Sequence, residues 1–203
     1  MKEIAAAIIT EIEKLKTEKD HLLIAIDGRC GSGKSTLGVY LQQELHGNLL
    51  HMDDFYLRPE QRTPERREEP GGNVDRERFL EEVLLPLHKE EGFLYRPFNC
   101  RKWELDEPVE VVPCPINIVE GSYSCHPELY TYYDLHVFLT IDPEEQMNRI
   151  RKRLGKMSCA ETFRTKWIPM EEKYFEKMQV RAKCELCFDT THAGRVDGQQ
   201  EEK

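Results

Sequence analysis

Short apolar runs alternate along the chain with amphipathic helical patterns. An apolar run of this length predicts a strand of a parallel sheet, because such a strand is buried on both of its faces. Strands are predicted at residues 22–27, 48–52, 116–120, 135–141 and 184–188. Apolar residues three or four positions apart predict helices. The predicted helices cover residues 2–19, 36–45, 75–87, 143–154 and 167–182.

This order of elements predicts a doubly wound α/β fold, in which a mostly parallel sheet of about five strands lies between helices. We expect one domain over residues 1–190, since a single hydrophobic core stabilises a chain of this length. A polar tail is expected at residues 191–203.

Two segments depart from the alternation. Residues 58–73 contain no aliphatic or aromatic residue and eight charged ones, so we expect a mobile loop there. Residues 93–112 alternate weakly and contain two prolines, which predicts a strand pair or an irregular excursion outside the main sheet.

Composition and charge argue against several classes of function. The net charge is −9, with 29 Lys and Arg against 38 Asp and Glu, which argues against binding nucleic acid through its phosphates. No apolar run approaches the roughly 18 residues of a membrane span, and no signal peptide is recognisable. The seven cysteines are an odd number in a domain that needs no disulfides. We therefore expect a cytoplasmic protein, with Cys184 and Cys187 as ordinary buried thiols.

One motif predicts chemistry directly. Residues 28–35 read GRCGSGKS and match the phosphate-loop pattern G-x-x-x-x-G-K-[ST], between a predicted strand and a predicted helix. In such a loop, backbone N–H groups surround a phosphate, Lys34 reaches the β- and γ-phosphates, and the Ser35 hydroxyl binds Mg²⁺. The expected nucleotide-binding residues are Gly28, Gly31, Ser32, Gly33, Lys34, Ser35 and Thr36.

Acidic residues end two of the predicted strands, at the edge of the sheet where ligands bind in open α/β folds. Asp53 is a candidate to accept a hydroxyl proton, whereas Asp54 is equally well interpreted as a turn cap. Glu120 ends the third predicted strand and is expected to face the same phosphate site.

Two arginines also point to phosphate chemistry. Arg149 and Arg153 are four residues apart on one predicted helix face, which suits a phosphoryl group in transfer. Arg151 and Lys152 are expected to point elsewhere, as a solvated basic helix end would.

Together these motifs resemble the uridine kinase family of P-loop kinases, which includes nicotinamide riboside kinases and is related to phosphoribulokinase and pantothenate kinase. The resemblance covers residues 22–189 and rests on IAIDGRCGSGKST, MDDFY, VDRERF, RPFNC, IVEGSY, FLTIDPEEQMNRIRKR and WIPMEEKYF. It implies a P-loop fold of three α/β/α layers. It also implies transfer of a phosphoryl group from ATP, or from GTP, to the 5′-hydroxyl of a nucleoside with Mg²⁺.

The resemblance implies roles for single residues. Asp53 corresponds to the catalytic aspartate and Asp75 to the aspartate that binds the ribose hydroxyls, although Glu120 is the general base in part of the family. The implied catalytic residues are Asp53, Lys34, Glu120 and Arg149, the Mg²⁺ ligands are Ser35, Asp53 and Glu120, and Arg153 joins the nucleotide-binding residues. The implied substrate-binding residues are Asp53, Tyr56, Asp75, Arg96 and Arg149. Residues 143–167 correspond to the lid, and a homo-oligomer is expected.

The acceptor stays open at this point. Uridine–cytidine kinases carry a Tyr-Asp and a later His around the base-binding hairpin, where this chain has Arg96-Pro97-Phe98-Asn99. Uridine or cytidine is therefore one expectation, and nicotinamide riboside, pantothenate or a phosphorylated sugar is another. The segment 58–73 either gates the site or contacts a charged acceptor. A nucleotide-dependent switch is a further alternative, although the chain lacks the Asn/Thr-Lys-x-Asp motif that reads guanine.

Overall fold

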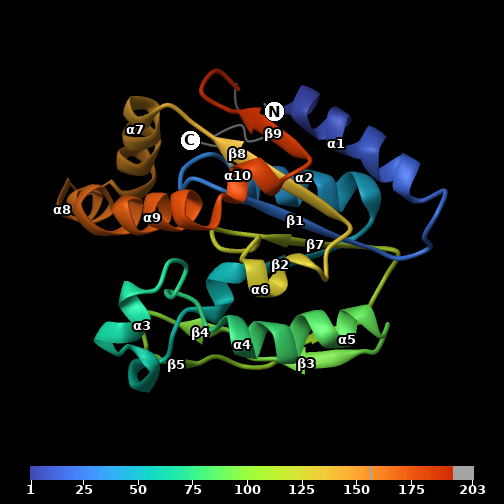
Figure 1. Ribbon diagram of the computed structural model, residues 1–203, viewed down its shortest axis with the longest axis horizontal. Coiled ribbons are helices and arrows are strands. Elements are labelled where there is room, and N and C mark those ends of the chain that lie inside the picture. Colours follow the sequence, from blue (N-terminus) through green and yellow to red (C-terminus); the bar gives the residue numbers. More distant parts are fainter. Residues whose placement is uncertain (156, 194–203) are drawn as a thin grey trace, which may run out of the picture.

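The central element is the strand β1 (Leu22–Gly28), which lies in the middle of a five-stranded parallel sheet (Figure 1). The strands follow the order β2–β7–β1–β8–β9 in this computed structural model, which describes residues 1–155 and 157–193. The other four strands are β2 (Asn48–His51), β7 (Ile116–Glu120), β8 (Leu135–Thr140) and β9 (Leu186–Asp189). All four neighbouring strand pairs are parallel, as predicted.

Helices cover both faces of this sheet and complete three layers (Figure 1). On one face, α1 (Lys2–Leu15) and α2 (Lys34–Leu45) pack on side chains that alternate along β1, among them Ile24 and Ile26. The intervening β1 residues, Leu23 and Ala25, belong to a second core on the opposite face. That core includes residues of α4 (Arg76–Phe79), α5 (Leu85–His88), α6 (Pro127–Tyr130), α9 (Ile168–Met178) and α10 (Val180–Lys183).

The helix α7 (Pro143–Leu154) has the predicted bounds. It begins after Asp142, whose side chain accepts hydrogen bonds from the next N–H groups, and it ends at Gly155 in the left-handed conformation. No helix in the described part of the chain is long and apolar enough to cross a bilayer.

Two helical stretches contain a wide π turn just before a proline. The turn η3 (Leu80–Leu84) separates α4 from α5, two residues before Pro86. The turn η4 (Phe163–Trp167) separates α8 (Met157–Thr162) from α9, two residues before Pro169. A proline ring clashes with the carbonyl four residues earlier in a regular helix, and a wider turn relieves that clash.

The segment 58–73 is more regular than the expected loop. It contains the turn η2 (Pro59–Gln61) and the helix α3 (Pro64–Glu68), and the residues that flank it pair in a β-bridge between Tyr56 and Val74. Ion pairs take the place of the missing apolar core. Arg66 contacts Glu77 of α4 at 2.7 Å, and this contact ties α3 to the body of the protein.

Residues 93–112 form strand pairs outside the main sheet, as predicted. The strand β3 (Phe93–Tyr95) is antiparallel to β6 (Val109–Val111), and β4 (Phe98–Asn99) is antiparallel to β5 (Glu104–Leu105). These strands and α3 to α5 lie together below the sheet in Figure 1.

The prediction that both cysteines of the CxxC motif are buried is wrong. Cys184 is half-buried, and Cys187 is exposed. The reason is the position of β9 at the edge of the sheet, which leaves one side of this strand without a neighbour.

Candidate active site

The phosphate-loop motif joins the end of β1 to the start of α2. Gly28 has a φ of 134°, and a Cβ atom at this position would lie 2.0 Å from the carbonyl oxygen of Leu139 on β8. Only glycine therefore fits where the chain leaves the sheet. Gly33, at the N-terminus of α2, also has a positive φ. Glycines with positive φ at these positions are typical of a loop whose backbone binds a phosphate.

The loop borders a cavity of about 1360 Å³. Of the predicted nucleotide-binding residues, Gly31, Gly33, Lys34, Ser35 and Thr36 line this cavity. Gly28 and Ser32 do not line it. Ser32 is fully buried, because the loop turns its side chain into the protein.

The side chain of Lys34 folds back over the loop. Its Nζ donates hydrogen bonds to the carbonyl oxygens of Gly28 and Arg29, at 2.7 Å and 3.1 Å, and to the hydroxyl of Ser122 at 3.3 Å. The ammonium group is thus held beside the N–H groups of the loop. Positive charge is concentrated there, which favours a bound phosphate.

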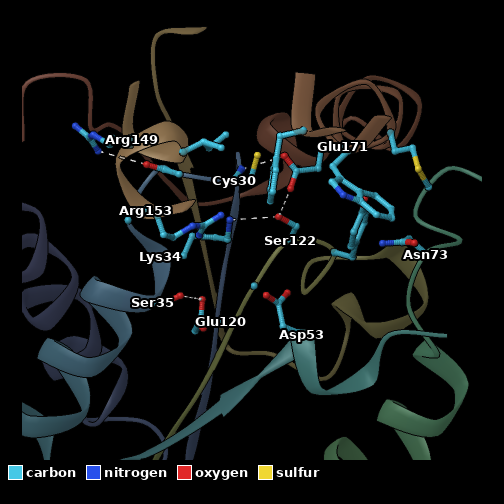
Figure 2. Close-up of a pocket in the computed structure, with 18 of the residues that line it drawn as sticks. Cys30, Lys34, Ser35, Asp53, Asn73, Glu120, Ser122, Arg149, Arg153 and Glu171 are labelled. Carbon is cyan, nitrogen blue, oxygen red and sulfur yellow. Dashed lines mark hydrogen bonds between the residues drawn. The ribbon is translucent and has the colours of Figure 1, made fainter. Parts of the chain in front are cut away.

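A buried carboxylate from α9 also contacts the loop, which the sequence did not indicate. Glu171 accepts the backbone N–H of Cys30 at 3.0 Å and the hydroxyl of Ser122 at 2.6 Å (Figure 2). Residues of three elements are joined in this way: the phosphate loop, the turn after β7 and α9. WIPMEEKYF contains Glu171, but nothing in that motif indicates which of its two glutamates turns inward.

A second buried acid supports the loop from below. Asp27 of β1 accepts backbone N–H groups of Gly28, Tyr123 and Cys125 and the hydroxyl of Tyr174. Burial raises the pKa of Asp27 to about 6, although these hydrogen bonds and Lys34 act in the opposite direction. Asp27 thereby fixes the turn after β7 relative to the phosphate loop.

Glu120 lies beside Ser35, as the predicted Mg²⁺ site requires. The Ser35 hydroxyl donates to one oxygen of Glu120 at 3.2 Å, and Nδ1 of His51 lies 2.6 Å from the other. His51 and Glu120 are direct neighbours in the register of β2 with β7. The hydrogen bond to Glu120 raises the pKa of His51, against the effect of partial burial.

The donor atoms at this point fit a magnesium ion. Mg²⁺ prefers oxygen ligands and is held by one or two carboxylates together with substrate phosphates and water. A serine hydroxyl and a glutamate carboxylate stand side by side next to the phosphate loop, both lining the cavity. Asp53, the third predicted ligand, lines the same cavity but contacts neither of them by a hydrogen bond.

Asp53 and Asp54 have different surroundings in η1 (Met52–Phe55). Asp53 is exposed, accepts a hydrogen bond from the Tyr56 hydroxyl at 2.9 Å, and points into the cavity (Figure 2). Asp54 faces away and accepts the hydroxyl of Tyr95 at 2.9 Å, and burial raises its pKa. Of the two, Asp53 has the position of a reactive carboxylate, while Asp54 ties η1 to β3.

The arginines of α7 line the opposite side of the cavity. Arg149 pairs with Glu145 at 2.9 Å and donates to the backbone oxygen of Thr190 at 2.7 Å. Arg153 lies with its guanidinium carbon 5.6 Å from the centre of the Phe163 ring. Lys152 also lines the cavity, contrary to the expectation that it points elsewhere. The basic end of α7 therefore presents Lys152 to the cavity in addition to the two arginines of the i, i+4 face.

Two expected substrate contacts lie outside the cavity. Asp75 is buried, accepts the backbone N–H of Arg78 as the N-cap of α4, and receives a hydrogen bond from Gln61 at 2.8 Å. Arg96 donates to the backbone oxygens of Leu105 and Asp106 and thereby joins the residue after β3 to the end of β5. Neither residue lines the cavity, and each forms hydrogen bonds with nearby backbone groups instead.

Cys30 is part of the phosphate loop and lines the cavity. Burial raises the pKa of its thiol to about 12, and the nearby Glu171 adds to the effect. The thiol therefore stays protonated, and a protonated thiol is unreactive. Cys30 is therefore interpreted as a small side chain without a redox role.

A family model described as an AAA domain matches residues 24–164, which is more than half of the chain. The chain belongs to this AAA domain family. No curated protein is a significant match to the sequence.

The fold of this AAA-domain chain is shared with solved kinases. A possible uridine kinase from Bacillus stearothermophilus is 20% identical with a TM-score of 0.71, over 93% of this chain and 98% of that one. A protein from Silicibacter sp. TM1040, proposed to be a fructose transport system kinase, is 22% identical with a TM-score of 0.74, over 91% and 98%. D-glycerate 3-kinase from Cryptococcus neoformans is 16% identical with a TM-score of 0.62, over 87% and 89%. The expected three-layer P-loop kinase fold is therefore confirmed.

Proposed function

We propose that this chain is a phosphotransferase that moves the γ-phosphoryl group of ATP to a hydroxyl group of a small metabolite. One observation carries the proposal. The phosphate loop with Lys34, the adjoining Ser35 and Glu120, and the exposed carboxylate of Asp53 all border one cavity. A donor phosphate and an acceptor hydroxyl need this combination of groups within one space.

The proposed reaction is a direct transfer between two oxygens. The acceptor hydroxyl oxygen forms a bond to the γ-phosphorus, the bond from this phosphorus to the β,γ-bridging oxygen breaks, and ADP leaves with that electron pair. The hydroxyl proton passes to the carboxylate of Asp53, which orients the acceptor oxygen. Lys34 and Arg149 stabilise negative charge on the phosphoryl group during transfer.

The protein holds the remaining components in place. Ser35 and Glu120 would hold a magnesium ion, which when bound neutralises charge on the donor phosphates. His51 keeps Glu120 oriented toward Ser35 through its hydrogen bond of 2.6 Å. Arg153 and Lys152 border the cavity from α7 and add positive charge where the donor phosphates are expected.

We assign the role of general base to Asp53 rather than to Glu120. Asp53 is exposed and accepts one side-chain hydrogen bond among the described residues, from Tyr56, so its carboxylate is accessible to a ligand hydroxyl. Glu120 is buried and already holds both Ser35 and His51. A carboxylate that binds a metal and a histidine has less capacity to accept a substrate proton.

The identity of the acceptor is proposed separately. A nucleoside such as uridine or cytidine is supported by the sequence resemblance, and GTP is the alternative donor. Nicotinamide riboside, pantothenate and a phosphorylated sugar are the alternative acceptors. The chain is further proposed to function in the cytoplasm as a single domain, with a homo-oligomer expected and neither nucleic acid nor membranes as partners.

The proposal is tested by measuring ADP release from Mg·ATP. The panel contains uridine, cytidine, nicotinamide riboside, pantothenate and ribulose 5-phosphate, together with a reaction that lacks an acceptor. A phosphotransferase releases ADP at a rate that depends on one of the acceptors. A slow rate that no acceptor changes would favour a nucleotide-dependent switch instead.

A further inference from the structure

Six arginines lie between residues 58 and 78, and four of them form ion pairs. The guanidinium of Arg66 contacts Glu77 at 2.7 Å, and that of Arg76 contacts Glu128 at 3.0 Å. None of these four borders the cavity. The paired arginines are Arg58, Arg66, Arg76 and Arg78, with Glu60, Glu69, Asp75, Glu77, Glu82 and Glu128 as partners. Their charges are therefore used to hold this segment together.

The other two arginines, Arg62 and Arg67, have the opposite placement. Both line the cavity, and neither forms an ion pair with any residue that the structure describes. A guanidinium without a carboxylate partner retains N–H donors for a ligand. Its planar arrangement of donors matches the oxygens of a carboxylate or a phosphate.

Arg62 is held in position by its surroundings. Its Nε–H donates to the carbonyl oxygen of Leu57 at 2.8 Å, and its guanidinium carbon lies 4.4 Å from the centre of the Trp103 ring and 5.6 Å from that of Phe98. A side chain fixed in this way loses little freedom when a ligand binds. Trp103 is itself 55% exposed and lines the cavity, so it offers a flat apolar surface beside the charge.

A third cation lies on another wall of the same cavity. Lys166 in η4 also has no ion pair within the described residues, and its Nζ lies 4.3 Å from the centre of the Trp167 ring. The segments 58–73 and 163–167 therefore both present cations next to an indole ring.

Among the residues that the structure describes, no carboxylate that lines the cavity forms an ion pair with these cations. Four acidic side chains of the described chain line it, and each has a different partner. Asp53 accepts from Tyr56, Glu120 from Ser35, Glu145 from Arg149 and Glu171 from Ser122. In a chain with a net charge of −9, unpaired cations gathered in a cavity attract a negatively charged ligand.

We propose that the acceptor carries an anionic group, a carboxylate or a phosphate, which Arg62 and Arg67 bind. Lys166 adds to the attraction, and Trp103 contacts the apolar part of the acceptor. The donor phosphates are assigned to the other side of the cavity, where the phosphate loop and Arg149 lie (Figure 2). This inference rests on the proposed phosphotransfer and restricts its acceptor to compounds that carry an anionic group. Uridine and cytidine lack such a group and are expected to be the poorer acceptors.

Binding is measured by titration calorimetry on the full chain, saturated with Mg²⁺ and a non-hydrolysable ATP analogue so that the donor side is filled. The probes are inorganic phosphate and three matched pairs: D-glycerate with glycerol, pantothenate with pantothenol, and ribulose 5-phosphate with ribulose. At least one anionic member is expected to bind about 10-fold or more tightly than its neutral counterpart. The first two pairs test a carboxylate, and the third tests a phosphate.

The variants Arg62→Gln and Arg67→Gln test the two assigned side chains. Each is expected to weaken binding of the anionic member by about 10-fold or more and to leave the neutral member unchanged. Arg62→Lys keeps the charge without the planar donors and is expected to lie between wild type and Arg62→Gln. Arg101→Gln is the matched control, since Arg101 is exposed in the neighbouring hairpin and does not line the cavity.

The inference is overturned if no anionic probe binds, if neutral and anionic members bind equally, or if the arginine variants change binding no more than Arg101→Gln does. ADP release from ATP with the same compounds is the separate readout of the proposed function. Anion binding that depends on Arg62 without any ADP release would contradict phosphotransfer and leave the anion site in place. Transfer to uridine that is insensitive to both arginines would contradict the anion site and leave phosphotransfer in place.

Discussion

At the scale of single residues, neighbouring acids in η1 have separate tasks. The carboxylate of Asp53 faces the cavity, whereas that of Asp54 faces Tyr95 on β3. Two adjacent residues thus provide a matched comparison of a reactive carboxylate with a structural one.

Asp53→Asn is expected to lower the rate of acceptor-dependent ADP release by about 100-fold or more, because the amide cannot accept the hydroxyl proton. Circular dichroism should show an unchanged fold, since Asp53 is exposed. Asp54→Asn is the control and is expected to reduce stability more than the rate of transfer. Full activity of Asp53→Asn would contradict this assignment and move the role of general base to Glu120.

The hydrogen bond between His51 and Glu120 predicts a pH-dependent contribution to stability. The pKa of His51 is raised above its ordinary value of 6.5, so the folded protein keeps this proton to higher pH than the unfolded chain does. The bond therefore stabilises the fold fully below about pH 6.5, and this stabilisation is lost as the pH rises through the raised pKa. The side chain of His51 is 41% exposed, so the effect is expected to be below about 1 kcal/mol.

Urea denaturation of wild type and His51→Gln between pH 6 and pH 9 checks this expectation. The difference between their free energies of unfolding should be largest near pH 6 and should shrink toward pH 9. His46→Gln removes an exposed histidine without an ion pair in the described chain and serves as the control. A difference that grows with pH would show that the sign is wrong.

The residues that sequence reasoning found are those whose role depends on local backbone. The phosphate loop is recognisable because its glycines and Lys34 are close neighbours in the chain. His51 was missed because its partner Glu120 is distant in sequence, and only the register of β2 with β7 brings the two together. Glu171 was missed for the same reason, since the packing of α9 on the phosphate loop decides its contacts.

At the scale of elements, α9 is joined to the phosphate loop by one buried side chain. The Glu171 carboxylate accepts hydrogen bonds from Cys30 and Ser122, which belong to two other elements. Glu171→Ala would leave both donors without this partner. We expect the free energy of unfolding to fall by about 1–3 kcal/mol, as for other buried groups that lose a partner.

The neighbouring residue on α9 is the matched control for this prediction. Glu172 pairs with Arg29 at 2.9 Å, but its side chain is 41% exposed. Glu172→Ala is therefore expected to cost less than about 1 kcal/mol. Urea denaturation compares the two variants, and equal losses of stability would contradict a special role for Glu171.

The boundaries of an element were predictable where a strong local signal marks its start or its end. Asp142 and Pro143 gave the start of α7 because an N-cap and a first-turn proline act within a few residues. Residues 58–73 predict a loop because they include no aliphatic or aromatic residue to bury. The helix α3 in this segment is instead held by ion pairs such as Arg66 with Glu77, whose partners the sequence does not indicate.

At the scale of the whole molecule, the cavity is built from segments that are far apart in the chain. The phosphate loop, η1, the segment 58–73, α7 and η4 all contribute to its lining. The sheet topology brings them together, since β1, β2 and β7 end at the same edge (Figure 1). The alternation of strands and helices was sufficient to predict that sheet, while the acceptor side depends on packing between excursions from it.

In the proposed function, this one cavity brings a donor phosphate to an acceptor hydroxyl. The most direct test follows the label from ATP labelled in its γ-phosphoryl group, with Mg²⁺ and each acceptor of the panel, for wild type and Lys34→Ala. We expect labelled acceptor with wild type and at least about 100-fold less with Lys34→Ala, which lacks the charge beside the loop. Label that appears only as inorganic phosphate, at a rate independent of every acceptor, would contradict phosphoryl transfer to a hydroxyl group.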